Sequence, residues 1–292
     1  MEAASPEPST TQPSHFAFDR RFDLSPVILT GILSLGAVAT MAPFVWMVLT
    51  SLKPEREVLR LPITFWPENF SVESYRTIFE QMPIERFLLN SVIVAFLSII
   101  PALFFGALAG YAFAKLAFKG REICFFFVIA VLMIPFEAKL IPLYLLFAEA
   151  GLSNTYLGLA GPGMFSAIGV FMMRQFMAQL PDDYLDAARI DGASELGVFW
   201  RIAVPLMRPA IFTLAIINFI SAWNSFLWPL VMAQTADRQT ITVGLATLGN
   251  DLYVVFSQLT AASLITVAPI IIVYVLLQRH VMQAMVGTGL KG

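Results

Sequence analysis

The sequence has little of what most catalytic and metal sites need. It holds one cysteine, Cys124, and two histidines, His15 and His280. One cysteine excludes an intrachain disulfide framework, and so few Cys and His residues exclude a metal site with several such ligands or a Ser-His-Asp triad. Charge is scarce as well, because only 13% of the residues are Asp, Glu, Lys or Arg, against about a quarter in soluble domains. A formal net charge of -2 gives no support to nucleic-acid binding, which needs clustered Lys and Arg.

The sequence does contain long apolar stretches. Hydrophobic residues make up 58% of the chain, and its mean hydropathy is +0.76. Six apolar stretches cover residues 27–49, 87–114, 123–148, 155–173, 209–233 and 259–277. Glu137 and Lys139 are the only charged residues within them. Each stretch suffices for a helix across the hydrocarbon core, which takes about 20 residues. The sequence therefore predicts an all-α membrane protein with six transmembrane helices over residues 27–292, preceded by a polar tail, 1–26, that we expect to be mobile.

The basic residues predict the orientation of these helices. Six crossings leave both termini on one side, and that side holds 11 of the 18 Lys and Arg residues, whereas the other side holds six. Lys and Arg are enriched in cytoplasmic loops. We therefore expect both termini and the loop 174–208 to be cytoplasmic.

The loop 174–208 contains the features of two helices. Asp182 is a residue type that caps helices, and the helix predicted over 183–191 ends at Gly192, which suits a left-handed C-terminal cap. A second helix begins directly afterwards and is ended by the prolines at positions 205 and 209. The product is a helix, a glycine turn and a second helix on the cytoplasmic side.

The string Asp186-Ala187-Ala188-Arg189-Ile190-Asp191-Gly192-Ala193, followed by Ile202 and Pro205, resembles the EAA coupling motif of binding-protein-dependent ATP-binding-cassette (ABC) importer permeases. Further likenesses, to the carbohydrate branch of that family, are carried by Asn90-Ser91, Tyr111-Ala112-Phe113-Ala114, Phe118-Lys119-Gly120-Arg121, Ile141-Pro142-Leu143-Tyr144, Ser221-Ala222-Trp223-Asn224 and Leu290-Lys291-Gly292. One departure is Asp186, which stands where the family usually has Glu. The resemblance implies a type I ABC importer permease fold with a cytoplasmic coupling helix.

The same resemblance implies a function and a set of partners. The family's permeases import a carbohydrate or related polyol that an extracytoplasmic binding protein delivers. They pair with a second homologous permease and with two ATPase subunits in the cytoplasmic (inner) membrane of bacteria. The residues it places at the ATPase contact are Asp186, Ala187, Ala188, Asp191, Gly192, Ala193, Ile202 and Pro205. The alternative for this loop is an amphipathic segment solvated at the membrane surface.

Nucleotide chemistry is expected outside this chain. A P-loop needs a Gly-Lys dipeptide within its motif, and that dipeptide does not occur in the sequence. We therefore expect no enzyme activity and no cofactor in this chain, with ATP and Mg bound by the ATPase subunits. The outer segment 234–258 is similar to the loop that faces the binding protein in such systems.

Five residues are candidates for a substrate pathway. Asn218, Trp223, Asn224 and Trp228 lie in the fifth apolar stretch, and Glu137 lies in the third. Aromatic faces with hydrogen-bonding neighbours suit sugars, and charged or amide groups inside a bilayer need partners or water. The alternatives are hydrogen bonds between helices, an interfacial aromatic belt and, for Glu137, a carboxylate that reaches the outer interface.

Two other functional classes remain as alternatives. The pair Asp191-Gly192 also occurs in the motif of intramembrane phosphatidyltransferases, but the spaced aspartates that bind metal in those enzymes do not follow here. A stand-alone secondary transporter would favour buried titratable groups or inverted repeats, of which the sequence offers only the pair at 137 and 139.

Overall fold

The computed structural model of the chain describes residues 25–248 and 255–289, the last segment from 279 onward by its backbone alone. Within these ranges every regular element is a helix. The predicted mobile tail, 1–26, lies outside the described residues except where α1 begins, at Ser25. The chain divides into two units, Met1–Trp46 and Met47–Gly292, which we describe separately.

The first unit consists of most of α1, Ser25–Ser51. This helix is apolar on all sides, and only 6% of its most apolar window is buried. Its length and composition are those of a membrane-spanning helix, as the sequence predicts for 27–49.

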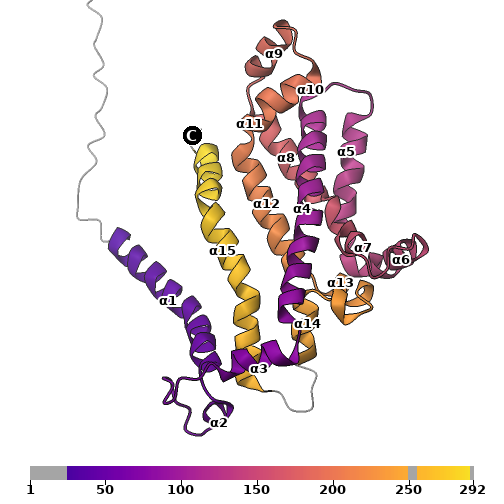
Figure 1. The fold of residues 1–292 in the computed structure, drawn as a ribbon. Coiled ribbons are helices and arrows are strands. Elements are labelled where there is room, and N and C mark those ends of the chain that lie inside the picture. Colours follow the sequence, from indigo (N-terminus) through magenta and orange to yellow (C-terminus); the bar gives the residue numbers. More distant parts are fainter. Residues whose placement is uncertain (1–24, 249–254, 290–292) are drawn as a thin grey trace, which may run out of the picture. The chain divides into compact units, whose positions relative to one another are not determined.

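Two more helices of the second unit have the length and hydropathy of membrane spans. They are α4, Ile84–Lys115, and α15, Phe256–Gly289, and they confirm the predicted helices at 87–114 and 259–277. Figure 1 shows α4 beside α8, Ala167–Gln179, and α12, Arg208–Trp223. The contact between α4 and α8 is close because Gly110 has no side chain: a Cβ there would lie 2.5 Å from the Cβ of Met173.

The third predicted span is not one helix. The structure has α5, Arg121–Ala130, a 3₁₀ turn at Val131–Met133, and α6, Phe136–Glu149, with a bend of 103° between the two parts. The segment 123–148 is therefore not a continuous helix, and its two parts are either one broken span or a re-entrant loop. Pro135 explains the break, because a proline has no N–H to donate and forces the residue before it into an extended conformation. Ile134 has that conformation, with φ -90° and ψ 115°.

The fourth and fifth predicted spans are broken as well. Residues 155–173 form α7, Tyr156–Ala160, a 3₁₀ turn at Gly161–Met164 and most of α8, with a bend of 41°. Residues 209–233 form α12, which ends at Trp223, and a separate α13, Leu227–Met232. In the described residues, three helices can each cross a membrane, or up to six spans exist if each bent pair counts as one.

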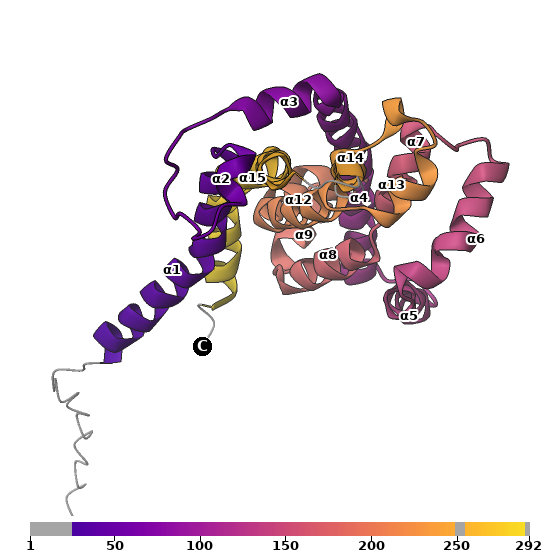
Figure 2. The same cartoon turned by 90° about the horizontal axis from the view of Figure 1, so that it is seen from below.

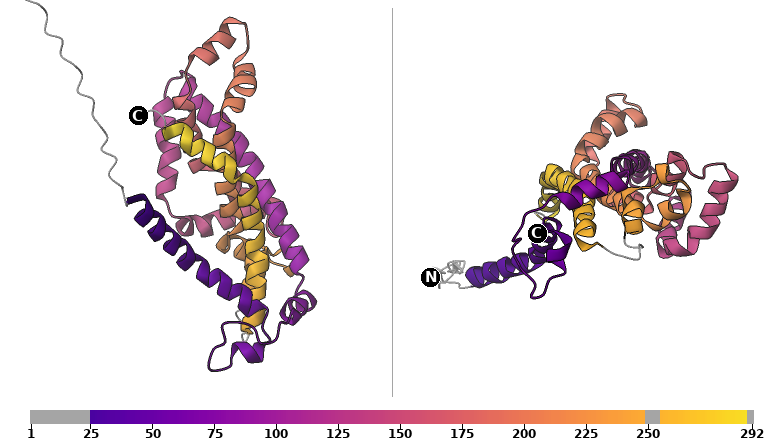
Figure 3. Two further views of the ribbon diagram at one scale, coloured as in Figure 1. Left: turned by 90° about the vertical axis from the view of Figure 1, so that its left-hand side faces the viewer. Right: turned by 60° about the horizontal axis from the view of Figure 1, so that its bottom comes forward.

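The remaining helices lie at the two ends of the second unit. At one end are α9, Asp183–Ile190, α10, Glu195–Val198, a π-helical segment at Phe199–Ala203, and α11, Val204–Leu206. At the other end are α2, Glu55–Val58, α3, Glu73–Gln81, a 3₁₀ turn at Ala236–Arg238, and α14, Ile241–Leu248. The left view of Figure 3 shows α9 and α10 projecting beyond the end of the bundle, and Figure 2 shows α5 and α6 on the flank next to α7 and α8.

The end that carries α3 is held together by polar contacts between distant segments. The carboxylate of Glu55 accepts hydrogen bonds from the N–H groups of Phe256 and Ser257 at 3.0 and 2.9 Å, and so caps the N-terminus of α15. The amide of Asn90 on α4 donates to the carbonyl oxygens of Asp237 and Gln239 at 3.0 and 2.8 Å. These contacts join α2 to α15 and α4 to the 3₁₀ turn.

Candidate functional site

The helix-turn-helix predicted in the loop 174–208, hereafter the coupling loop, is present. The first helix, α9, spans Asp183–Ile190, and Gly192 follows with φ +85°, the left-handed conformation that the sequence suggests. The second begins at α10, where the hydroxyl of Ser194 accepts a hydrogen bond from the N–H of Gly197 at 3.3 Å. Local capping chemistry therefore fixes both the turn and the start of the second helix.

One predicted detail of the coupling loop was wrong. Asp182 stands at the N-cap position of α9, but its side chain makes no capping hydrogen bond; its carboxylate instead accepts a hydrogen bond of 2.6 Å from the ammonium group of Lys115 on α4. That ammonium group, with its side chain only 6% exposed, lowers the pKa of Asp182.

The second helix ends at Leu206, between the two prolines that the sequence predicts to end it. The chain then bends by 76° into α12, which starts at Arg208. The π-helical segment Phe199–Ala203 precedes Pro205, so the regular α-helical hydrogen-bond pattern is already interrupted where the proline cannot donate.

A chain of charged hydrogen bonds links α9, α10 and α4. The guanidinium of Arg189 donates to Asp186 Oδ1 at 2.7 Å and to Glu195 Oε1 at 2.8 Å. The other oxygen of Glu195 accepts a hydrogen bond of 2.7 Å from the hydroxyl of Tyr111. The carboxylates of Glu195 and Asp186 raise the pKa of Arg189, so its charge is permanent. The sequence alone does not reveal the bond between Tyr111 and Glu195, because these residues are 84 positions apart in the chain.

An apolar cluster holds the coupling loop on the bundle. Leu185 of α9 and Phe199 of the π-helical segment are 0% and 1% exposed, and the ring of Phe199 lies 5.4 Å from that of Tyr111. The cluster also contains Ala107, Met173, Met177, Val198, Ala203, Met207, Ala210 and Leu214. The loop is therefore anchored by its inner side chains on α4, α8 and α12.

The outer side of the coupling loop is exposed and partly apolar. Tyr184, Ile190 and Leu196 are 59%, 86% and 64% exposed. Of the residues that the resemblance assigns to ATPase contact, Asp186, Ala187, Asp191 and Gly192 are exposed, and Ala188, Ala193, Ile202 and Pro205 are half-buried. Exposed apolar side chains on a rigid projection are typical of a protein-binding surface.

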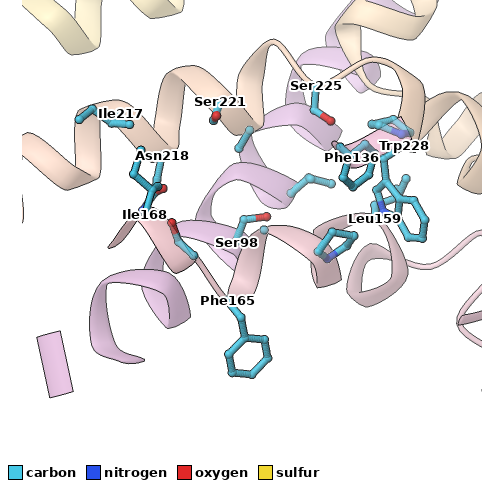
Figure 4. Close-up of a pocket in the computed structure, with 16 residues that line it drawn as sticks. Ser98, Phe136, Leu159, Phe165, Ile168, Ile217, Asn218, Ser221, Ser225 and Trp228 are labelled. Atoms are coloured by element: carbon cyan, nitrogen blue, oxygen red, sulfur yellow. The ribbon is translucent and has the colours of Figure 1, made fainter. Parts of the chain in front are cut away.

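A cavity of about 340 Å³ lies between α4, α7, α8, α12 and α13 (Figure 4). Its lining comprises Val94, Ser98, Phe136, Leu159, Pro162, Gly163, Phe165, Ser166, Ile168, Ile217, Asn218, Ser221, Ala222, Ser225, Trp228 and Pro229. The amide nitrogen of Asn218 is buried and has no hydrogen-bond partner within the described residues. The lining therefore combines hydroxyl and amide groups with three aromatic rings, those of Phe136, Phe165 and Trp228.

The structure brings two of the five predicted pathway residues to this cavity, Asn218 and Trp228. Trp223 is 1% exposed and donates its indole N–H to the carbonyl of Thr266 at 3.0 Å, on the side of α12 that faces α15. Asn224 and Glu137 are exposed and do not belong to the lining. The lining also holds four serines, Ser98, Ser166, Ser221 and Ser225. Ser98 and Ser166 lie outside the fifth apolar stretch and were not singled out from the sequence.

Comparison with known proteins places this geometry in a family. The model of the binding-protein-dependent transport system inner membrane component matches residues 102–287, which contain the whole coupling loop and nearly all of the cavity lining. The chain belongs to this family. It is 36% identical to the arabinooligosaccharides transport system permease protein AraQ of Halalkalibacterium halodurans, over 91% of this chain and 98% of that protein. It is 31% identical to the lactose transport system permease protein LacG of Rhizobium radiobacter, over 91% of this chain and 96% of that protein.

The fold agrees with this membership. A crystal structure of a bacterial ABC transporter involved in the import of the acidic polysaccharide alginate matches with a TM-score of 0.79 at 21% identity, over 92% of this chain and 100% of the other. The prediction of an all-α ABC importer permease fold is thereby confirmed. As a member of the family of binding-protein-dependent permeases, the chain is a transport subunit, and its family membership supports neither of the two alternative functions.

Proposed function

We propose that this permease is one membrane-spanning subunit of an ATP-driven importer for a carbohydrate or related polyol. Its relatives AraQ and LacG are named for arabinooligosaccharide and lactose transport, which supports a sugar as cargo. The observation that carries the proposal is the coupling loop, whose exposed Ile190 lies next to the turn at Gly192 on an anchored helix. Such a surface can receive a force from a bound protein and pass it to the bundle.

The coupling loop connects an outer surface with the helices of the bundle through two sets of contacts. On its outer side, Tyr184, Ile190 and Leu196 form the proposed ATPase-binding surface. On its inner side, Glu195 bonds to Tyr111 of α4, and Leu185 packs in the apolar cluster. A displacement of α9 by an ATPase would therefore move α4 with it, because breaking a hydrogen bond to a charged group costs about 1.5–3 kcal/mol.

The cavity beside α12 is the proposed position of the cargo within this subunit. The unsatisfied amide of Asn218 and the hydroxyls of Ser221 and Ser225 can bond to sugar hydroxyls, and the ring of Trp228 offers an apolar face. The indole N–H of Trp228 already donates to the carbonyl of Gly158 at 2.9 Å, which fixes the ring. A pathway role for Trp223, Asn224 and Glu137 stays a prediction.

The remaining parts of the proposal concern partners and orientation. An extracytoplasmic binding protein delivers the cargo at the end that carries α3 and α14, and two ATPase subunits bind at the end that carries α9. A second, homologous permease completes the membrane pathway, and ATP and Mg are bound by the ATPase subunits. Both termini are cytoplasmic in this arrangement, in the inner membrane of a bacterium, as the distribution of Lys and Arg favours.

The test is a single substitution on the proposed ATPase surface. Ile190→Asp places a charge on the most exposed apolar side chain of the coupling loop, so we expect the permease to reach the membrane at normal levels but to lose both the co-purifying ATPase and sugar uptake. The matched control is Ile63→Asp, an exposed isoleucine at the opposite end, which should keep the ATPase. Retention of the ATPase and of uptake by Ile190→Asp would refute the proposed coupling.

A further inference from the structure

A second hollow, hereafter the groove, lies on the flank of the bundle where α5 bends into α6. It has a volume of about 610 Å³. Its lining consists of Val131, Phe136, Lys139, Leu143, Phe147, Leu152, Leu157, Gly161, Pro162, Met164 and Phe165. Ten of these eleven residues are uncharged and apolar or glycine, and Lys139 supplies the single charge. The groove is therefore lined by apolar residues and by one positively charged side chain, that of Lys139.

Lys139 has no partner for its charge among the described residues. Its side chain is half-buried, and no hydrogen bond or ion pair of its ammonium group occurs in that part of the chain. It lies on α6, in a helix pair whose hydropathy is that of a membrane span. Charged groups at such positions are costly and are normally paired, so a negative charge beyond the described residues would stabilise Lys139.

We propose that the groove binds one anionic phospholipid, with its phosphate on Lys139 and an acyl chain along the apolar wall. Two features favour this occupant. The positive charge of Lys139 is complementary to the negative charge of a phosphate headgroup. The wall formed by Leu143, Phe147, Leu157 and Met164 offers an acyl chain the apolar surface that it needs.

The groove and the cargo cavity share part of their walls. Phe136, Pro162 and Phe165 line both of them. The 3₁₀ turn that separates them is tightly packed, because a Cβ at Gly161 would lie 2.2 Å from Cε1 of Phe147. A lipid in the groove therefore contacts the segment that forms the cavity wall, and its presence supports transport. This consequence, unlike the lipid site itself, rests on the proposed function.

The binding test uses the complete, purified importer complex and native mass spectrometry with phosphatidylglycerol or phosphatidylcholine added. We expect the wild type to retain phosphatidylglycerol in preference to phosphatidylcholine. Lys139→Gln should lower that retention about fivefold, as expected for the loss of one lysine at an anionic headgroup. Lys139→Arg should keep it. The matched control Lys119→Gln, which removes an exposed lysine at the other end of α5, should leave it unchanged.

A second variant tests the apolar part of the site while keeping the charge. Leu157 is 54% exposed and lines the groove, so Leu157→Trp fills the groove without disturbing a buried side chain. We expect it to reduce phosphatidylglycerol retention to a similar degree. Unchanged retention in Lys139→Gln, or an effect of Lys139→Gln without any effect of Leu157→Trp, would overturn the proposal. Loss of the second permease from the Lys139→Gln complex would also overturn it, because a protein carboxylate would then be the partner.

Uptake into vesicles separates this proposal from the proposed function. Wild-type importer should be several-fold more active in vesicles with phosphatidylglycerol than in pure phosphatidylcholine, and Lys139→Gln should lose that difference. If no sugar is taken up in either lipid while Lys139-dependent lipid binding persists, the lipid site holds and the proposed function fails.

Discussion

The hydroxyl of Tyr111, near the end of α4, donates a hydrogen bond of 2.7 Å to Glu195, the first residue of α10. Tyr111 is 2% exposed, whereas the side chain of Glu195 is 49% exposed and also pairs with Arg189. One carboxylate therefore connects a buried residue of a membrane-spanning helix with the projecting α9. No other side chain of the loop bonds to both α9 and α4 within the described residues.

The first prediction concerns this bond. Tyr111→Phe removes the hydroxyl and keeps the ring contact with Phe199, so we expect normal protein levels, ATP hydrolysis that continues, and uptake reduced several-fold. In a double-mutant cycle with Glu195→Gln, the coupling free energy obtained from the uptake rates should be about 0.5–3 kcal/mol. The control is Tyr274→Phe, which changes an exposed tyrosine on α15. Additive effects of the two substitutions on uptake would show that the bond does not transmit the motion.

The second prediction concerns the turn at Gly192. A side chain there would meet no atom within 4 Å, but the φ of +85° is unfavourable for any residue with a Cβ, by about 1–2 kcal/mol. We expect Gly192→Ala to shift the orientation of α9 and to lower uptake strongly. Gly151→Ala is the matched control, because Gly151 also has a positive φ, +71°, and open surroundings but lies far from the coupling loop.

Both variants carry the same local strain, so their effects on thermal stability should be alike. Their effects on uptake and on ATPase co-purification should differ. Equal losses of uptake in the two variants would mean that backbone strain alone, and not the geometry of the coupling loop, limits transport.

The helix α9 and its glycine turn could be predicted from the sequence because they depend on neighbouring residues. The long-range contacts of α9 could not be predicted. A glycine after an alanine-rich helix predicts a left-handed turn from neighbouring residues alone, and Gly192 has one. The partner of Asp182 is Lys115, 67 residues away, and a sequence gives no distance between them. Neighbouring residues alone favour a capping role for the side chain of Asp182. In the structure its carboxylate pairs with Lys115 instead.

The angles by which the spans bend could not be predicted for a different reason. Hydropathy averages composition over a window, so residues 123–148 appear as one stretch whether or not Pro135 turns the chain by 103°. The residues that line the cavity could not be predicted from composition either. Successive residues of a helix are 100° apart, so Asn218 and Trp223 point in directions about 140° apart. Composition alone cannot show which direction faces the cavity and which faces α15.

The third prediction concerns the contact between α4 and α8. A Cβ on Gly110 would lie 2.5 Å from the Cβ of Met173 and 2.8 Å from the backbone of Arg174, so the two helices must separate to accept it. We expect Gly110→Ala to cost about 1–3 kcal/mol and to lower the thermal midpoint of the purified permease. On the same helix, Gly106→Ala meets nothing closer than 3.5 Å and should be tolerated. Equal midpoints for both variants would contradict this packing.

The last prediction uses the pH dependence of the contact between Asp182 and Lys115. The hydrogen bond from Lys115 lowers the pKa of Asp182 in the folded protein. A lowered pKa means that the contact stabilises the fold at every pH above the unfolded value of about 3.9 and that this contribution is lost as the pH falls through the folded value. Between pH 7 and pH 5 the contribution of this contact to the free energy of unfolding should therefore be constant.

Asp182→Asn removes the titrating group, so the thermal midpoint of this variant should fall less steeply below pH 4 than that of the wild type, while its midpoint at pH 7 should be lower. Asp183→Asn is the control, because this neighbouring carboxylate is exposed and should leave the wild-type pH profile in place. Parallel profiles for Asp182→Asn and the wild type below pH 4 would show that the ion pair does not hold the coupling loop on α4. The opposite result would mean that α4 is attached to the coupling loop at two points, Lys115 and Tyr111, one turn apart on the same helix.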